Sequence, residues 1–368
     1  MNNFLFENRT KFLFGGGCVK EYLASFLKGY GPSVLLVTGA GGEAEGPALE
    51  EVSRILRTGK KMVVECAIHS LCPGAGEAQQ AARLCRENHV DLILGVGGGA
   101  VLDCCKATAL AAVCRGDLWE DFWLRRGVVD RQPLPVGFVA AAIETGAASG
   151  AAGLLHEGRC IWRDYTQCDP KFVLMDPGYT QALPRTQLTA QAFSALAGAL
   201  EYCLAPSEGA EVSRDMLETL LRGMIGNLRA CLRDRKDDGA RSDLMWACSQ
   251  WGGRLFQLGR QSAFPALPVR AQALSLAAET GCGYADALAV LLLALCRQEA
   301  EQSPAVMARM ARQVWELPCE GHTELQQARA GVDALADFLV ELGLPTEPEQ
   351  LDGALQTALR ENPMVYTA

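Results

Sequence analysis

Three consecutive glycines, Gly97, Gly98 and Gly99, separate an apolar run from a helix-forming run in the stretch GVGGGAVLDCCK. Glycines let backbone N–H groups approach a phosphate closely, and the N-terminus of the helix that follows adds partial positive charge. The stretch therefore predicts a pyrophosphate site. Asp103 and Lys106, on the first turns of that helix, are placed to hold ribose or phosphate oxygens. The glycines taken alone also fit a tight strand-to-helix turn that binds nothing.

A second glycine-rich stretch, GAGGEAEG (39–46), follows the first long apolar strand, where doubly wound folds hold the adenosine end of a dinucleotide. A carboxylate directly after that strand normally accepts a hydrogen bond from the ribose 2′-hydroxyl. Gly39 stands at this position and leaves room for a 2′-phosphate, but Glu43 and Glu45 follow and would repel one. The stretch does not decide between NAD and NADP, and it equally fits a solvated acidic loop.

Side chains that hold metals are scarce. The stretch LTAQAFSALAGALEYCL (188–204) predicts a strong amphipathic helix whose polar face carries almost no ligand groups. None of the 15 cysteines forms a CxxC motif or pairs with a histidine at zinc-finger spacing. Most cysteines lie in apolar surroundings, so we expect buried free thiols in a reducing compartment. The chain has four histidines: His69, His89, His156 and His322.

The first half of the chain alternates strand and helix patterns, which predicts a parallel, doubly wound α/β sheet. Short apolar runs indicate buried strands, and longer amphipathic runs bounded by glycine indicate helices. We expect strands at residues 3–6, 11–14, 33–39, 61–67, 91–99, 133–141 and 171–177, and helices at 19–31, 48–60, 76–90 and 101–114.

From about Leu183 and Pro184 onward, nearly every segment has helical periodicity. We place the domain boundary there. This gives a dinucleotide-binding α/β domain over residues 1–183 and a helical domain over residues 184–368. The charged stretch RDRKDDGARSD (233–243) is interpreted as a solvated connection.

The composition is that of a globular protein long enough for two domains, with 368 residues, of which 49% are hydrophobic and 21% charged. The net charge of −9 disfavours nucleic acid as a partner. The N-terminal stretch MNNFLFENRTKFLF lacks the pattern of a signal peptide. The longest apolar run, residues 287–296, is too short to span a bilayer. We therefore expect a cytoplasmic protein without membrane contact.

Over about residues 3–363, the chain resembles the iron-containing (group III) alcohol dehydrogenases, above all their butanol dehydrogenase branch. The stretches that carry the resemblance are FLFENRTKFLFGGG, LCRENHVDLILGVGGGAVLDCCKATAL, RGDLWEDFW, PLPVGFVAAAIETGAASG, DPGYTQALPRTQLTAQAFSALAGALEYCL, LMWACSQ, VWELP and ADFLVELGLPTEP. The resemblance implies a Rossmann-like α/β domain, an all-α metal-binding domain of the dehydroquinate synthase-like architecture and a cleft between them.

In that family a divalent metal, held by one Asp and three His, polarises the oxygen of an alcohol or aldehyde during hydride transfer. By the resemblance, the Asp position is Ser194, and the first His position, four residues later on the same helix face, is Gly198. The second His position is Pro268, and the third is Cys282 or Tyr284. We therefore expect no metal.

The cofactor side is partly retained. Ala100 replaces a serine of the glycine motif, Ala147 and Ala148 replace the Ser and Glu of a Thr-Gly-Ser-Glu turn, and Cys72 replaces a strand-end Asn. Glu201, one turn past the altered metal positions, is interpreted as a helix-packing residue rather than a lone acid in the cleft. The residues that the resemblance assigns to NAD(P) binding are Gly39, Gly97, Gly98, Gly99, Asp103, Lys106, Thr145, Gly146, Thr180 and Leu183.

These replacements leave three functional hypotheses. The first is a pseudoenzyme that keeps the fold and a dinucleotide site but has lost metal-dependent alcohol or aldehyde chemistry, and for which no catalytic residue is assigned. The second is an active NAD(P)-dependent alcohol dehydrogenase or aldehyde reductase that uses Cys282, Tyr284 or Glu201. The third is a non-catalytic interaction protein. Family members often dimerise through N-terminal strands, so FLFENRTKFLF predicts a homodimer, with an intramolecular hairpin as the alternative.

Overall fold

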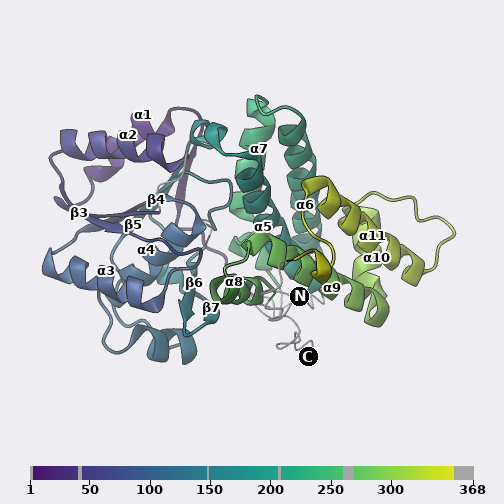
Figure 1. Ribbon diagram of the computed structural model, residues 1–368. Helices are drawn as coiled ribbons and strands as arrows, with labels where there is room; N and C mark the ends of the chain where they lie inside the picture. Colours follow the sequence, from purple (N-terminus) through teal and green to yellow (C-terminus); the bar gives the residue numbers. More distant parts are fainter. Residues whose placement is uncertain (1–2, 40–43, 147–148, 206–208, 260–268, 352–368) are drawn as a thin grey trace. The chain divides into compact units, whose positions relative to one another are not determined.

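The structure is a computed structural model that describes residues 3–39, 44–146, 149–205, 209–259 and 269–351 (Figure 1). Pro268, Ala147, Ala148 and Glu43 lie outside the described residues. The chain divides into two units. The α/β unit comprises Phe6–Leu188 and Asn227–Arg254, and the helical unit comprises Met1–Leu5, Thr189–Gly226 and Leu255–Ala368. The division between residues 183 and 184 stays a prediction.

A six-stranded sheet in the order β1-β8-β5-β4-β2-β3, with every neighbouring pair parallel, confirms the predicted doubly wound α/β fold. The inner strands are buried along almost their whole length, as their continuous apolar runs predict for strands covered on both faces. The strands are β1 (Lys11–Phe14), β2 (Ser33–Thr38), β3 (Met62–Ala67), β4 (Leu92–Gly97), β5 (Val136–Ala140) and β8 (Phe172–Met175).

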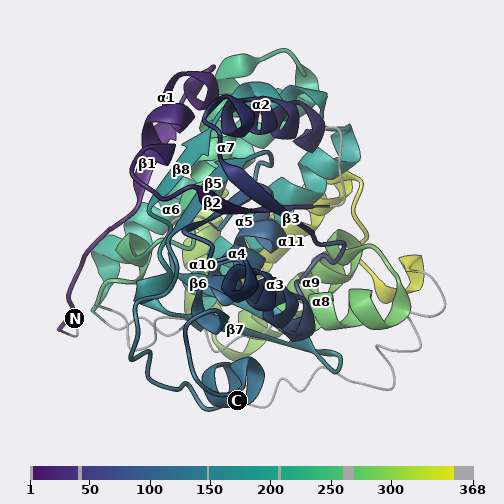
Figure 2. The same cartoon turned by 90° about the vertical axis from the view of Figure 1, so that its left-hand side faces the viewer.

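Helices cover both faces of this sheet (Figures 1 and 2). On one face lie α1 (Cys18–Leu27) and α2 (Glu45–Thr58), whose apolar side chains form one core with those of the inner strands. On the other face lie α3 (Ala75–Glu87) and α4 (Gly99–Ala111), which share a second core with Trp119, Phe122 and Trp123. The sheet is therefore fixed from both sides, and the turns at the ends of its strands are held in place.

The antiparallel hairpin of β6 (Ala151–His156) and β7 (Arg159–Asp164) is absent from the sequence-based expectation. Its signal in the sequence is the dipeptide Glu157-Gly158, which forms the two-residue turn with φ angles of 49° and 75°. A short π-helix, η1 (Leu118–Leu124), and the 3₁₀ turns η2 (Thr166–Cys168) and η3 (Pro177–Ala182) are also additional to the predicted elements.

The predicted strand at residues 3–6 is wrong, because these residues belong to no strand and Leu5 is 90% exposed. The alternative of an intramolecular hairpin at the N-terminus is therefore also wrong. Residues 11–14 do form a strand, β1, but it pairs in parallel with β8 at one edge of the sheet. Pairing with β8 partly buries Phe12 and Leu13, the two middle residues of β1.

The described chain after β8 is helical, as predicted. The long helix α5 (Arg185–Leu204) forms over the predicted segment, but the prediction of an amphipathic helix is wrong, because residues 192–204 are all buried and leave no exposed polar face. The other helices are α6 (Glu211–Arg233), α7 (Asp238–Gln250), α8 (Val269–Thr280), α9 (Tyr284–Gln302), α10 (Pro304–Gln313) and α11 (Glu324–Leu342), with 3₁₀ turns η4 (Arg254–Gln257) and η5 (Pro348–Gln350). Among the described residues, no helix is long and apolar enough to cross a bilayer.

The charged stretch at residues 233–243 is not a solvated connection throughout, which corrects the prediction. The Asp237 side chain accepts a hydrogen bond from the backbone N–H of Ala240 and so starts α7 within this stretch. Arg241 is only 1% exposed, and its guanidinium donates to the backbone carbonyls of Thr180 at 2.9 Å and Arg235 at 3.1 Å. A charged side chain can be buried when carbonyl groups accept its hydrogen bonds, so a run of charged residues does not by itself indicate a solvated loop.

Candidate functional site

The three glycines lie at the C-terminal end of β4, as predicted. β4 ends at Gly97, Gly98 caps the next helix, and Gly99 is the first residue of α4. Gly97 has a φ of +151°, and a Cβ there would lie 2.7 Å from Cγ2 of Val101. Only glycine fits that position, so residue 97 places no side chain over the backbone N–H groups at the start of α4.

These glycines also lie at the point where the order of the strands reverses. From β2 the chain crosses to β3, whereas from β4 it crosses to β5 on the opposite side. β2 and β4 are direct neighbours, with Thr38 in register with Val96. In open α/β sheets, ligands bind beyond the carboxyl ends of the strands at such a switch point.

The turn that contains Thr145 and Gly146 adjoins the glycines. A Cβ at Gly99 would lie 3.8 Å from the backbone carbon and oxygen of Thr145. The hydroxyl of Thr145 is buried and has no hydrogen-bond partner within the described residues. A buried hydroxyl without a partner is uncommon in folded proteins, and a ligand oxygen next to Gly99 would supply one. The glycine backbone and this hydroxyl offer hydrogen-bond donors to a dinucleotide phosphate, whereas the Glu144 carboxylate beside Gly99 opposes its charge.

Lys106 and Asp103 reach from α4 to the structure that surrounds this turn. The ammonium of Lys106 donates to the carbonyls of Gly146 at 3.1 Å and Ala151 at 2.8 Å, and Asp103 accepts from the backbone N–H of Gly153 at 2.9 Å. Burial lowers the pKa of Lys106, while the nearby Asp103 carboxylate acts in the opposite direction. Both residues position the turn and β6. Whether they also contact a cofactor stays a prediction.

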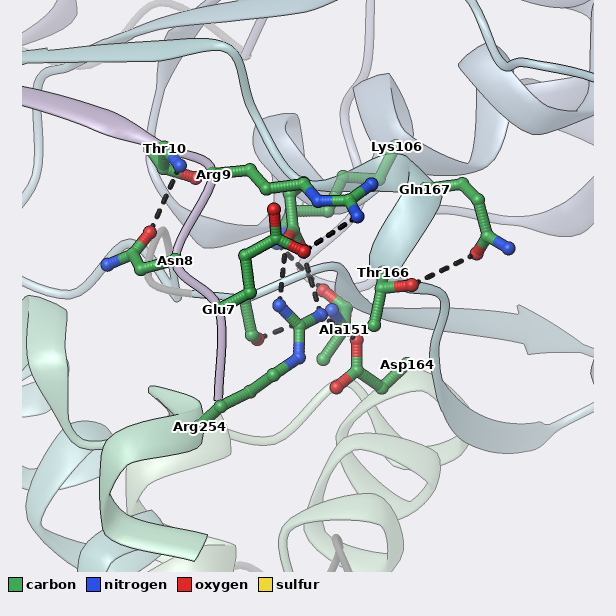
Figure 3. Close-up of polar contacts among 12 residues, drawn as sticks. Glu7, Asn8, Arg9, Thr10, Lys106, Ala151, Asp164, Thr166, Gln167 and Arg254 are labelled. Carbon is green, nitrogen blue, oxygen red and sulfur yellow. Dashed lines mark hydrogen bonds and ion pairs between the residues drawn. The ribbon is translucent and has the colours of Figure 1, made fainter. Parts of the chain in front are cut away.

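Arg254 supports the same region, although no sequence pattern singled it out. Its guanidinium donates to Asp169 at 2.7 Å and to Asp164 at 2.8 Å. Figure 3 shows this arginine next to the contact of Lys106 with Ala151. Burial alone would lower the pKa of Arg254, but the bonds to Asp169 and Asp164 raise it above its ordinary value. Partners separated by 85 or more positions in the chain give no local signal in the sequence.

Thr180 and Leu183 lie after β8 and are both buried. The hydroxyl of Thr180 donates to the carbonyl of Pro177 at 2.8 Å within its own turn. The carbonyl of Leu183 accepts from the guanidinium of Arg235 at 2.9 Å. These contacts fix the backbone of the segment, and cofactor contacts of the two residues stay a prediction.

Two carboxylates lie at the glycine positions. A Cβ at Gly97 would be 2.9 Å from Oε1 of Glu45, and a Cβ at Gly99 would be 3.5 Å from Oε2 of Glu144. Gly39, which follows β2, adjoins the same Glu45 carboxylate: a Cβ there would be 2.5 Å from its Oε1. Glu45, which the sequence includes in the glycine-rich stretch 39–46 after the strand, is the first residue of α2.

In the helical unit, the structure brings together two of the positions that the family resemblance assigns to metal ligands. The hydroxyl oxygens of Ser194, in α5, and Tyr284, the first residue of α9, are 3.4 Å apart. Cys282 lies in the turn between α8 and α9, where its backbone N–H donates to the hydroxyl of Thr280 at 3.3 Å. Gly198 lies one helical turn after Ser194 and is buried.

Glu201 is 5% exposed and connects α5 to the start of α8. Its Oε1 accepts a hydrogen bond from the backbone N–H of Arg270 at 3.1 Å. Burial raises the pKa of Glu201 to about 7, against the opposing effect of Arg270. The contact satisfies one of the free N–H groups of the first turn of α8, which agrees with the packing role expected from the sequence.

These residues do not fit the family's metal. A serine hydroxyl is a poor substitute for a carboxylate ligand, and glycine offers no side-chain donor. Among the described residues, which exclude Pro268, no three His, Cys, Asp or Glu side chains lie close enough together to hold a metal ion.

The chain is similar to known proteins over nearly its whole length. The sequence model of the iron-containing alcohol dehydrogenase family matches residues 9–177. The probable NADH-dependent butanol dehydrogenase 1 of Bacillus subtilis (strain 168) is 26% identical, with 98% of this chain and 94% of that protein covered. The NADPH-dependent aldehyde reductase YqhD of Escherichia coli (strain K12) is 27% identical, with 98% and 92% covered.

Solved structures give the same result for the fold. The crystal structure of E. coli K-12 YqhD superimposes with a TM-score of 0.84 at 26% identity and covers 99% of this chain and 93% of that chain. The NADH-dependent butanol dehydrogenase A of Thermotoga maritima gives a TM-score of 0.81 at 24% identity, with 98% and 92% covered.

Proposed function

Because the chain belongs to the iron-containing alcohol dehydrogenase family, we propose that it binds NAD(P) at the turn between β4 and α4 but does not carry out metal-dependent hydride transfer with an alcohol or aldehyde. Hydride transfer is the chemistry that a bound nicotinamide supplies. Gly97, Gly98 and Gly99 would let backbone N–H groups approach the pyrophosphate, and Thr145 would donate to one of its oxygens. Lys106 would hold the turn that carries Thr145.

The replacement of the ligand pair on α5 by Ser194 and Gly198 carries the second half of the proposal. A metal ion stabilises the charge on a substrate oxygen by several kcal/mol, and a serine hydroxyl beside a glycine offers neither the charge nor the number of ligands to hold one. A general base is a partial substitute for a metal, but the described chain has no histidine on α5, α8 or α9 to act as one.

Thermal denaturation with NAD, NADH, NADP and NADPH tests this proposal. We expect at least one of the four to raise the midpoint, because a ligand that binds only the folded state stabilises it. A midpoint unmoved by all four would contradict dinucleotide binding and would favour the third hypothesis, a non-catalytic interaction protein.

The hydroxyl pair of Ser194 and Tyr284 favours a second candidate, a metal-independent reductase. Two hydroxyls at one place would donate hydrogen bonds to a carbonyl oxygen while its carbon receives hydride from NAD(P)H. Tyr284 would give its proton to that oxygen and regain one from solvent, so that an aldehyde, NAD(P)H and one proton yield an alcohol and NAD(P)⁺. Aldehyde turnover that survives a chelator and is abolished by Tyr284→Phe would support this candidate over the first.

We also propose that the protein is a cytoplasmic homodimer. β1 forms one edge of the sheet, and the residues before it in the chain include the exposed side chains of Phe4, Leu5 and Phe6. Exposed apolar side chains in the segment that leads into an edge strand favour pairing with a second copy. The molar mass in solution tests this, and a monomer at micromolar concentration would contradict it.

A further inference from the structure

The carboxylate of Glu45 lies between the ends of β2 and β4. A Cβ built on Gly39, just after β2, would be 2.5 Å from its Oε1 and 2.8 Å from its Oε2. A Cβ built on Gly97, the last residue of β4, would be 2.9 Å from the same Oε1. These two strands are adjacent and flank the point where the strand order reverses. One carboxylate therefore occupies the space above both glycines.

Doubly wound folds that bind NAD place a carboxylate at this point, where it accepts hydrogen bonds from the adenosine ribose. That carboxylate normally belongs to the residue at the end of the strand, which here is Gly39 and has no side chain. Glu45 delivers a carboxylate to the same place from the first turn of α2. The missing acid of the strand end is thus supplied six positions later in the chain.

We propose that Glu45 binds the adenosine ribose hydroxyls and makes the site selective for NAD(H) over NADP(H), an assignment that rests on the proposed dinucleotide function. A ribose 2′-hydroxyl donates to the carboxylate, whereas a 2′-phosphate brings a second negative group against it. Like charges at contact distance repel strongly where water is partly excluded. Glu45 determines specificity here and takes no part in the chemical step.

A side chain at residue 39 would compete with the carboxylate of Glu45 for the same place. Its Cβ would come within 3 Å of both carboxylate oxygens, so the flexible Glu45 side chain would have to move away from the glycines. The φ of Gly39 lies outside the left-handed region, so the backbone itself accepts other residues. An aspartate at position 39 would therefore fit once the Glu45 side chain is removed, with its carboxylate near the place that Glu45 occupies now.

The test measures the dissociation constants of NADH and NADPH, which differ only in the 2′-phosphate, by nicotinamide fluorescence. Four proteins are compared: wild type, Glu45→Gln, the double variant Gly39→Asp with Glu45→Ala, and Glu50→Gln. Glu50 lies on the exposed side of the same helix, so its variant makes the same change in charge away from the glycines.

We expect wild type to bind NADH at least about tenfold more tightly than NADPH. Glu45→Gln should weaken NADH and strengthen NADPH, the double variant should restore the preference for NADH, and Glu50→Gln should leave the ratio unchanged. A ratio that stays constant in Glu45→Gln, or an equal gain in affinity for both, overturns the assignment while leaving dinucleotide binding intact. A wild-type protein that binds neither overturns both.

Discussion

The hydroxyl oxygen of Ser194 on α5 lies 3.4 Å from the hydroxyl oxygen of Tyr284 at the start of α9. Related enzymes, by the family resemblance, join these two segments through a metal ion. Here two neutral side chains meet instead, and Glu201 makes a separate link from α5 to α8. In the helical unit, hydrogen-bonding groups therefore link α5 directly to α9 and to α8, where the family resemblance implies a metal ion.

Replacing Tyr284 with Phe removes one half of this contact and tests its strength. We expect a loss of about 0.5–1.5 kcal/mol in the free energy of unfolding, the typical value of one hydrogen bond, measured with urea. Tyr22→Phe, on the exposed side of α1, is the matched control and should change stability less. A Tyr284→Phe protein that no longer folds would contradict this value, because the Tyr284 hydroxyl would then contribute far more than one hydrogen bond to the free energy of unfolding.

Replacing Gly99 with Ala should separate binding from folding. The added Cβ would meet only ordinary contacts, the nearest at 3.5 Å to Oε2 of Glu144, so stability should change by less than about 1 kcal/mol. The methyl group would, however, stand where a phosphate approaches the start of α4, and we expect NADH affinity to fall about tenfold or more. Gly76→Ala, in the first turn of α3 with open space around it, should leave NADH affinity unchanged.

Replacing Lys106 with Met keeps the aliphatic stem and removes the ammonium. The carbonyls of Gly146 and Ala151 would lose their donor, and each buried unsatisfied group costs about 1–3 kcal/mol. We expect a clear loss of stability together with weaker NADH binding, because the turn that carries Thr145 loses its support. Lys20→Met, at an exposed position of α1, should do neither. Unchanged stability would refute the supporting role of Lys106.

Glu201 should make stability depend on pH near neutrality. Its pKa in the folded protein is about 7, against an ordinary value of 4.5. Between these values the folded state holds a proton that the unfolded state has released, so the free energy of unfolding falls as pH rises. Relative to Glu201→Gln, the free energy of unfolding of wild type should fall by about 3 kcal/mol between pH 4.5 and 7. It should fall no further above that range.

The free energy of unfolding is measured for wild type and for Glu201→Gln at each pH. The difference between the two values removes the effect of the other carboxylates. Glu279→Gln, at an exposed position of α8, serves as the control and should follow wild type. Parallel curves for wild type and Glu201→Gln would contradict the buried, protonated state of Glu201.

The sequence predicts the fold well because the signals of its main elements are local. The apolar run of β4, its glycines and the start of α4 all lie within one short stretch, and the structure has them in the predicted order. The hairpin of β6 and β7 escaped prediction because its main signal is a two-residue turn at Glu157 and Gly158.

The candidate site is harder to predict because its contacts are long-range. The bonds of Lys106 to Gly146 and Ala151, and of Arg254 to Asp169, join residues that are 40 to 85 positions apart. Glu45 reads as a loop residue in the sequence, and only the folded chain places its carboxylate over Gly39 and Gly97. Tertiary structure decides which neighbours such polar groups meet, and no local pattern encodes it.

The central claim, a dinucleotide site without the family's metal site, is tested most directly by measuring both on one sample. Metal content is determined by mass spectrometry on protein purified after anaerobic incubation with Fe²⁺ or Zn²⁺, and NADH is titrated before and after treatment with a chelator. We predict one NADH per chain, metal far below one per chain, and NADH affinity that the chelator does not change. One tightly held metal per chain, with NADH binding lost on its removal, would contradict the account.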